Sequence, residues 1–298
     1  MLQCGHCTCC CYLYYFWSWP ELNEKQNICV KISWSEELIF MKVEYYVFSG
    51  TGNTLMIARE VGGRLAERGC DVSYRMIGKP EMFKIQGECV VGLAFPIAFF
   101  SSYPLVLNFI ASLPQGKGRK IFMTATMAGA AMGAEGKFRS MVSDKGYVPV
   151  GSEIFQMPGN YNNKTINAVK NKATITAALT EARSFADSLI DGTSRWNRGV
   201  PIIPSLWQWF VRSGRALRFF YGMFPIAIDN DRCIKCMRCL ENCPAHAIDK
   251  NSESLFIYPE RCQSCQRCVA FCPVKAVIVP GKPAEQYRAM DFEEFIKD

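Results

Sequence analysis

The chain has 298 residues, of which 49% are hydrophobic and 20% are charged, and its formal net charge is +7. These proportions exclude an intrinsically disordered chain and predict a globular protein of about two domains, at roughly 150 residues each. Among the residues are 16 cysteines, of which eight follow residue 230 in a regular pattern. That regularity indicates metal binding rather than a disulfide framework.

Residues 1–40 differ in composition from the rest of the chain. They contain six cysteines and three tryptophans but show neither a helical nor a strand period. One interpretation is an over-extended reading frame, with Met41 as the biological start, and the other is a small metal-binding extension built on the CGHC motif at residues 4–7. A secretory signal is not expected, because the first basic residue is Lys25 and the apolar run 12–19 is too short.

From Met41 to about residue 191, strand-like and helix-like segments alternate. Strands are predicted at 42–48, 71–76, 88–95, 119–125 and 147–154, and helices at about 53–68, 104–113, 131–145 and 165–190. The strands 88–95 and 119–125 are almost wholly apolar, which is typical of strands with helices on both faces. The order of elements predicts an α/β fold, a doubly wound parallel sheet of five strands.

The longest uncharged stretch, residues 89–114, raises the question of a membrane span. Pro96, Ser101, Ser102 and Pro104 interrupt it. A buried strand, a loop and an apolar helix explain the stretch better than a transmembrane helix does.

A short turn rich in glycine and hydroxyl groups follows the first predicted strand and opens the first helix. It consists of Ser49, Gly50, Thr51, Gly52, Asn53 and Thr54. Backbone N–H groups and the helix dipole at such a turn favour an anion, and the hydroxyl groups add donors. The turn is neither a Walker loop nor a GxGxxG loop. It predicts a phosphate site, with a helix cap that binds no ligand as the alternative.

The turn resembles the FMN phosphate loop of flavodoxins, whose fold has the same five-stranded sheet. In that fold two further loops, after the third and fourth strands, flank the flavin ring. The resemblance therefore implies an FMN site that also includes Pro96, Phe99, Phe100, Thr124, Thr126 and Gly129. Phe99 or Phe100 is expected to stack on the flavin, unless both aromatic rings simply fill the core.

Residues 192–228 form a connector rich in proline, glycine and aromatic residues. It carries five arginines and no acidic residue, and a basic amphipathic helix is predicted at 205–221. Such a helix can contact a membrane surface or an acidic partner, but we favour packing at a domain junction with the arginines in water. Nucleic-acid binding is not expected, because the positive charge is local and no recognised motif is present.

The last cysteines form a repeat. Cys233-x2-Cys236-x2-Cys239-x3-Cys243-Pro recurs 29 residues later as Cys262-x2-Cys265-x2-Cys268-x3-Cys272-Pro. In this pattern three close thiolates hold one [4Fe–4S] cluster and the fourth cysteine ligates the other cluster. The spacing therefore predicts two clusters, one ligated by Cys233, Cys236, Cys239 and Cys272, and one by Cys262, Cys265, Cys268 and Cys243.

Zinc is the competing metal for these cysteines. Zinc sites use paired CxxC knuckles separated by longer loops rather than three cysteines within seven residues followed by Cys-Pro. The repeat resembles bacterial two-cluster ferredoxins. His246, beside a fourth cysteine, is expected to be a packing or outer-sphere residue rather than a ligand. Because thiolate-ligated iron needs a reducing compartment, we expect a cytoplasmic protein.

Residues 41–298 as a whole resemble the EFR-type ferredoxins, which fuse a flavodoxin-like domain to a two-cluster ferredoxin domain. The resemblance rests on residues 49–54, 92–96 and 157–161 and on both cysteine runs. The expected domains are the extension 1–40, the FMN domain 41–191, the connector 192–228, the ferredoxin domain 229–280 and the tail 281–298.

Three functions remain open at this point. The first is an electron carrier that relays electrons between the two clusters and FMN and serves a redox partner protein. The second is an FMN-dependent reductase of a small organic electron acceptor, for which Tyr103 and Tyr161 are the candidate proton donors. The third is a cluster-based redox sensor. We favour the carrier, because the sequence has no evident acid/base pair near the predicted flavin site.

Overall fold

The computed structural model describes residues 41–78, 85, 87–129, 131, 133–160, 167–197, 222, 224–281 and 287–297. The extension 1–40 and the helix predicted at 205–221 lie outside the described residues, as does Tyr161.

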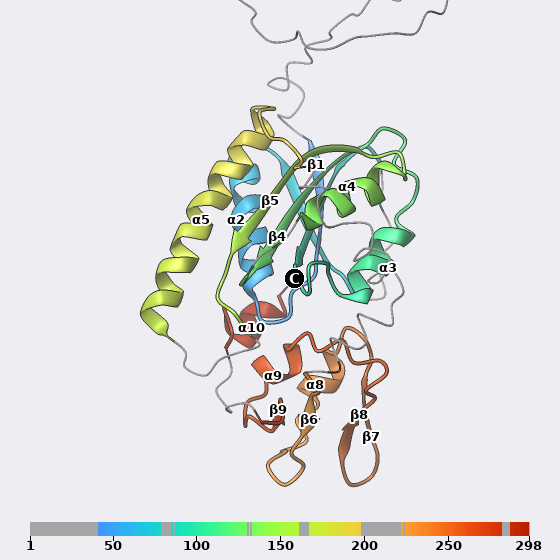
Figure 1. Ribbon diagram of the computed structural model, residues 1–298, viewed down its shortest axis with the longest axis vertical. Coiled ribbons are helices and arrows are strands. Elements are labelled where there is room, and N and C mark those ends of the chain that lie inside the picture. The colour runs from blue at the N-terminus through green and yellow to red at the C-terminus, as the bar shows by residue number, and fades with distance from the viewer. Residues whose placement is uncertain are drawn as a thin grey trace, which may run out of the picture. The chain divides into compact units, whose positions relative to one another are not determined.

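Five parallel strands form the central sheet (Figure 1). They are β1 (Lys42–Val47), β2 (Asp71–Met76), β3 (Val90–Pro96), β4 (Lys120–Met127) and β5 (Val148–Gln156). Their order is β2-β1-β3-β4-β5. This is the flavodoxin-like order, in which the chain reverses direction across the sheet between β1 and β3. The fold class predicted from the sequence is therefore confirmed.

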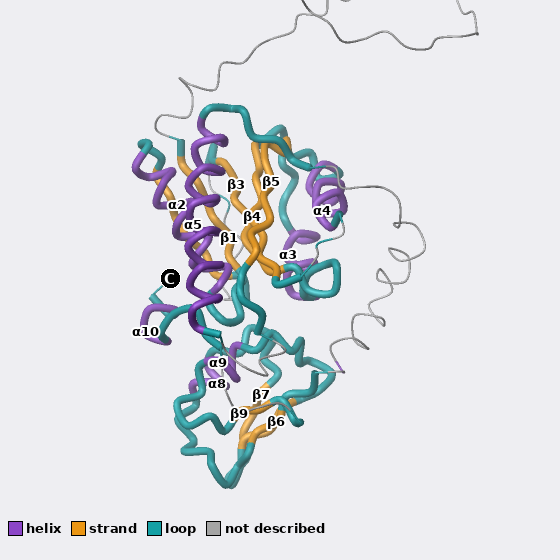
Figure 2. The backbone as a smooth tube through the Cα atoms, turned by 60° about the vertical axis from the view of Figure 1, so that its left-hand side comes forward, coloured by secondary structure: helices purple, strands orange, loops and turns teal. Residues whose placement is uncertain are grey.

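Helices cover both faces of this sheet (Figure 2). On one face lie α2 (Asn53–Glu67) and α5 (Ala168–Ile190), and on the other lie α3 (Pro104–Ser112) and α4 (Ala134–Ser143). Each face has its own apolar core, one around Phe122 and Phe185 and the other around Phe109 and Phe138. Burial on both faces explains why the central strands are so apolar.

The uncharged stretch 89–114 belongs to this core. It forms strand β3, a loop and helix α3, as the sequence indicated. Within the part of the chain that the structure describes, no helix is long and apolar enough to cross a membrane.

The cysteine-rich segment forms a small second domain. Two antiparallel ribbons pair β6 (Ala227–Ile228) with β9 (Val277–Ile278) and β7 (Ile248–Lys250) with β8 (Leu255–Ile257). Two single-turn helices, α8 (Arg238–Glu241) and α9 (Arg267–Ala270), carry the third cysteine of each run. A last short helix, α10 (Phe292–Phe295), follows this domain.

Candidate cofactor sites

The backbone of the two cysteine loops repeats as closely as their sequence. Left-handed residues recur 29 positions apart: Lys235 with Ser264, Met237 with Gln266, and His246 with Lys275. All six have φ between 47° and 64°, although none is glycine. Non-glycine residues adopt this conformation at a cost of about 1 kcal/mol or more each, so a strong local requirement must fix it. Wrapping the chain around a group held by the cysteines is such a requirement.

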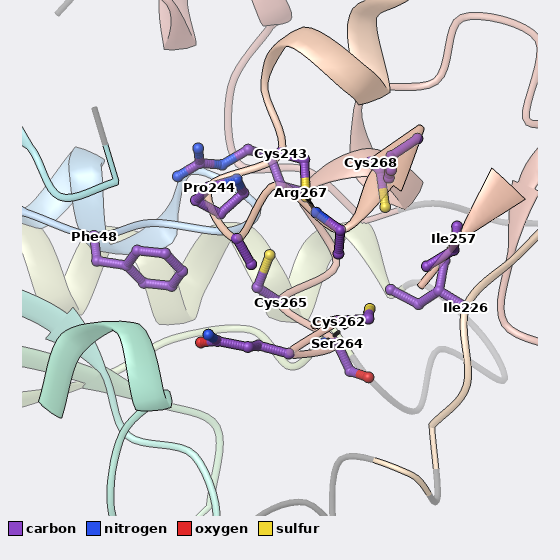
Figure 3. Close-up of a pocket in the computed structure, with 14 residues that line it drawn as sticks. Phe48, Ile226, Cys243, Pro244, Ile257, Cys262, Ser264, Cys265, Arg267 and Cys268 are labelled. Carbon is purple, nitrogen blue, oxygen red and sulfur yellow. Dashed lines mark hydrogen bonds between the residues drawn. The ribbon is translucent and has the colours of Figure 1, made fainter. Parts of the chain in front are cut away.

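Four cysteines of the predicted second set line one cavity (Figure 3). Cys243, Cys262, Cys265 and Cys268 surround it together with apolar side chains such as Ile226 and Ile257. Cys243 comes from the first run and the other three come from the second, as expected if the fourth cysteine of each run crosses over. The cysteines of the described part of the chain are free of disulfide bonds.

The other set is gathered in the same way. Cys239 lies close enough to Cys233, Cys236 and Cys272 for their charges to raise the pKa of its thiol, after burial has raised it most, to about 11. Burial is also the main cause that raises the pKa of Cys265 to about 11 and the pKa of the Cys268 thiol well above its ordinary value. A bound cation such as iron stabilises the thiolate form of such thiols.

Backbone N–H groups point at the sulfur atoms in matching pairs. The N–H of Ala247 donates to Cys243 Sγ at 3.3 Å, and the N–H of Ala276 donates to Cys272 Sγ at 3.2 Å. Such hydrogen bonds to sulfur stabilise the more negative, reduced state of a bound cluster. The loops therefore fit iron–sulfur clusters in their ligand type, ligand grouping and donors, whereas ligation itself stays a prediction.

The phosphate-loop residues stand at the edge of the sheet where β1, β3 and β4 end. Gly52 has φ +98°, and its N–H donates to Ser49 Oγ at 3.2 Å. Thr54 Oγ1 lies 2.7 Å from Thr126 Oγ1, which joins this loop to the end of β4. Helix α2 starts here with no acidic residue in its first turn and no side-chain cap at its N-terminus. Its first N–H groups are therefore available to an anion.

A cavity opens between the three strand ends. Its lining includes the predicted residues Ser49, Gly50, Thr51, Asn53, Thr54, Pro96 and Thr126. Further lining residues are Ile97, Ala98, Tyr103, Met127, Ala128, Met157, Pro158, Asn160 and Cys265. The lining thus combines hydroxyl and amide groups with apolar side chains, a combination that fits the phosphate and the ring of FMN.

The other predicted flavin contacts lie elsewhere. Thr124 is fully buried and its Oγ1 lies 2.6 Å from the hydroxyl of Tyr45, while Gly129 is exposed. Neither residue lines the cavity, and neither does Gly52. Phe99 and Phe100 occupy a tight turn between the paired residues Ala98 and Ser101, with φ of 50° and 59°. The ring of Phe99 lies 6.1 Å from that of Phe224. Stacking of Phe99 or Phe100 on a flavin stays a prediction.

The two candidate sites meet at Cys265. This residue lines both the cysteine cavity and the cavity of the phosphate loop. Gly50 packs so closely on it that a Cβ atom at position 50 would collide with the carbonyl oxygen of Cys265. The guanidinium of Arg267 donates to the carbonyl oxygen of Ser49. Contacts between the two domains therefore include the phosphate loop itself.

Several residues of the site were not among the predicted site residues, although one of them, Asn160, lies within the 157–161 segment that carries the family resemblance. Asn160 donates to Thr51 Oγ1 at 3.3 Å, and Tyr287, from the end of the chain, donates to Asn53 Oδ1 at 2.6 Å. Arg267 also was not predicted. The sequence offers one signal for it: an arginine directly precedes the third cysteine in both runs, as Arg238 does 29 residues earlier.

Comparison with known proteins supports part of this assignment. Residues 232–276 match the family model of the 4Fe-4S dicluster domain. The match implies two [4Fe–4S] clusters in this segment, which contains all eight cysteines of the repeat. No curated protein matches the chain.

Solved flavodoxin structures match the first domain at low identity. The Megasphaera elsdenii flavodoxin is 20% identical, with a TM-score of 0.35, and the match covers 47% of this chain and 98% of that one. The Streptococcus pneumonia TIGR4 flavodoxin is 14% identical, with a TM-score of 0.35, over 49% of this chain and 98% of that one. Rubredoxin oxygen:oxidoreductase from the anaerobe Desulfovibrio gigas is 14% identical, with a TM-score of 0.36, over 52% of this chain and 37% of that one. The fold assignment rests on the strand order.

Proposed function

We propose that this chain is an electron carrier that exchanges electrons between two [4Fe–4S] clusters and one FMN within a single polypeptide. The observation that carries the proposal is the position of Cys265, which borders both cavities. Bound clusters exchange single electrons and FMN exchanges one or two, so the two kinds of group together convert between one-electron and two-electron chemistry.

The residues of this chain supply the binding sites and the short path between them. Cys243, Cys262, Cys265 and Cys268 would hold the cluster nearest the phosphate loop, and Cys233, Cys236, Cys239 and Cys272 would hold the other. Ser49, Gly50, Thr51, Asn53 and Thr54 would hold the FMN phosphate through N–H and hydroxyl donors, and the apolar residues of the same lining would exclude water from the ring.

A redox partner protein would dock on the loop of the first cysteine run, residues 233–239. Cys236 is exposed there, and the side chain of Ile234 is 61% exposed. An exposed aliphatic side chain beside a metal ligand suits a small, transient docking surface. The proposal also includes membership of the EFR-type ferredoxins, a cytoplasmic location and anaerobic operation.

The reductase alternative depends on the flavin cavity. Tyr103 lines it and is 2% exposed, so it is the best-placed proton donor among the described residues. The described lining contains no aspartate, glutamate, histidine or lysine. This composition supports the carrier over a reductase with its own acid/base pair.

The test is to express residues 41–298 without oxygen, reconstitute iron and sulfide, and quantify iron, acid-labile sulfide and FMN. We expect about eight irons and about one FMN per chain, from two four-iron clusters and one phosphate loop. Stopped-flow reduction should then show the flavin absorbance following the cluster absorbance. Eight irons without flavin would overturn the FMN assignment, and steady turnover of a small organic acceptor without any partner would favour the reductase.

A further inference from the structure

The end of the chain returns to the phosphate loop. Residues 287–297, here called the returning segment, follow the cysteine-rich domain but contact the first domain. The hydroxyl of Tyr287 donates to Asn53 Oδ1 at 2.6 Å, and both residues are at most 9% exposed. The N–H of Ala289 donates to the carbonyl oxygen of Thr51 at 2.8 Å. A segment that the sequence marks only as a polar tail thus makes two hydrogen bonds to the loop.

These contacts fix the conformation of the loop. Asn53 Nδ2 donates to the carbonyl oxygen of Pro158 at 2.9 Å, so Tyr287 holds the amide in the orientation that joins the loop to the chain after β5. Met290 lies against Gly52, where a Cβ atom would come within 2.9 Å of Met290 Cγ. The returning segment therefore contacts three consecutive residues of the loop, positions 51 to 53, one of which is the left-handed Gly52.

The same segment is anchored on both domains. On α2, Arg59 donates to Glu294 Oε1 at 3.0 Å and to the carbonyl oxygen of Glu294 at 2.7 Å. On the cysteine-rich domain, the ring of Phe271 lies 4.6 Å from that of Phe295 and 5.7 Å from that of Phe292.

A second contact reaches the other cysteine loop. Arg238 Nη2 lies 3.3 Å from Glu293 Oε1, and the guanidinium of Arg238 lies 4.5 Å above the ring of Phe292. Arg238 and Phe271 are each next to a predicted cluster ligand in the sequence, Cys239 and Cys272. The position of the returning segment therefore depends on the folded state of both cysteine loops.

We propose that the returning segment is part of the FMN phosphate site and couples flavin affinity to cluster occupancy. The proposal rests on the proposed function, because it concerns the same loop. A small domain with short strands and eight cysteines depends on its clusters for folding, as other small metal domains do. When the clusters are absent, Arg238 and Phe271 lose their fixed positions, the returning segment loses its anchor, and the loop loses the hydrogen bonds from Tyr287 and Ala289. Linkage then requires that FMN in turn favours the cluster-loaded state.

The experiment measures the dissociation constant of FMN, by quenching of its fluorescence, for the full 298-residue chain under anaerobic conditions. The wild-type chain is compared with and without reconstituted clusters, beside the variants Tyr287→Phe and Tyr258→Phe. Tyr258 is the matched control because it belongs to the cysteine-rich domain and packs on Phe256 and Arg261, away from the loop. We expect Tyr287→Phe to weaken FMN binding roughly tenfold, since the buried Asn53 amide loses its donor. Removal of the clusters should weaken binding at least as much, and Tyr258→Phe should have no effect.

Two results would overturn the proposal: wild-type affinity in the cluster-loaded Tyr287→Phe chain, or equal affinity in the cluster-loaded and cluster-free wild-type chains. Hydrogen exchange provides a readout that needs no flavin. Amides of residues 50–56 should be less protected in Tyr287→Phe and in the cluster-free chain, and unchanged protection in both would also overturn the proposal. A wild-type chain that binds no FMN while showing these protection changes would refute the proposed function but keep the structural coupling.

Discussion

The guanidinium of Arg267 donates two hydrogen bonds to the carbonyl oxygen of Ser49, from Nη2 at 2.7 Å and from Nε at 3.2 Å. A third bond, from Nη1, reaches the carbonyl oxygen of Asn242 at 3.1 Å. Burial lowers the pKa of this guanidinium, and the neighbouring Cys265, Cys243 and Cys268 oppose that shift. Arg267 thus places a positive charge between the phosphate loop and the cavity that is lined by Cys243, Cys262, Cys265 and Cys268.

The equivalent residue of the first cysteine loop has another environment. Arg238 is partly exposed and pairs with the carboxylate of Glu293 at 3.3 Å. The repeat therefore supplies one arginine to each loop. Arg267 donates to backbone carbonyl oxygens, whereas Arg238 forms an ion pair. The two potential cluster sites should consequently differ in electrostatic potential.

The first prediction is that Arg267→Gln lowers the reduction potential of one cluster. A partly buried positive charge stabilises the reduced cluster, and at an effective dielectric constant near 20 its loss is worth about 2 kcal/mol, or roughly 50–100 mV for one electron. Redox titration followed by EPR measures the shift. Arg267→Lys keeps the charge and should restore most of the potential.

Arg238→Gln is the matched control for this prediction. Its charge is already offset by Glu293 and screened by water, so the potentials should change much less. Equal shifts for Arg238→Gln and Arg267→Gln would contradict the asymmetry of the two sites.

The second prediction concerns the crossing of the fourth cysteine. Cys243→Ala combined with Cys262→Ala should remove one cluster and leave about four irons, because both residues belong to the same predicted set. Cys243→Ala combined with Cys233→Ala should damage both clusters. Iron analysis and the EPR signal of the reduced chain report the result. The reverse pattern would mean that each run of four cysteines holds its own cluster.

The sequence predicts the elements that local physics determines. All five strands and all four helices of the first domain occur where hydrophobic periodicity placed them, with ends shifted by up to three residues. Spacing also predicts the crossed cysteine sets, and Cys243 lines one cavity with Cys262, Cys265 and Cys268, while ligation itself stays a prediction. Ser49 and Thr54, which the local loop pattern singles out, line the second cavity, and their contact with a phosphate stays a prediction.

Long-range partners are what the sequence does not reveal. Tyr287 and Asn53 are 234 residues apart, and no periodicity links them. Thr124 satisfied the pattern of a flavin loop, yet its position within β4 turns its hydroxyl toward Tyr45. The left-handed conformation of Phe99 and Phe100 is likewise unexpected, because both residues disfavour it; the paired Ala98 and Ser101 close the turn.

The third prediction contrasts two glycines. Gly50→Ala should destabilise the chain by about 1–3 kcal/mol, because the added methyl group meets backbone atoms of Cys265, which cannot move aside as a flexible side chain can. Gly63→Ala, in α2, meets no atom within 4 Å and should stabilise the chain by about 0.5–1 kcal/mol through helix propensity. Urea unfolding under anaerobic conditions measures both changes. Equal stability of the two variants would contradict the close approach of the loop to Cys265.

The last prediction concerns the carboxyl group of Glu135, in helix α4. Burial raises the pKa of Glu135 above its ordinary value of 4.5, against opposing hydrogen bonds from Asn197 and Ser152. A raised pKa means that the folded state binds a proton more tightly than the unfolded state. The resulting stabilisation is complete below pH 4.5 and is lost as the pH rises through the folded-state value.

Glu135→Gln removes the ionisable group but keeps an oxygen that can accept from Ser152. The variant should therefore be more stable than the wild type, with an advantage that is larger at pH 8 than at pH 5. Glu67→Gln is the control of opposite sign: Arg64 and Arg183 lower the pKa of Glu67 below its ordinary value of 4.5, so this carboxyl group is mostly ionised at both pH values. Its loss should cost a small and equal amount of stability at pH 5 and pH 8. An advantage of Glu135→Gln that did not grow with pH would show that burial of the Glu135 carboxylate imposes no penalty on folding.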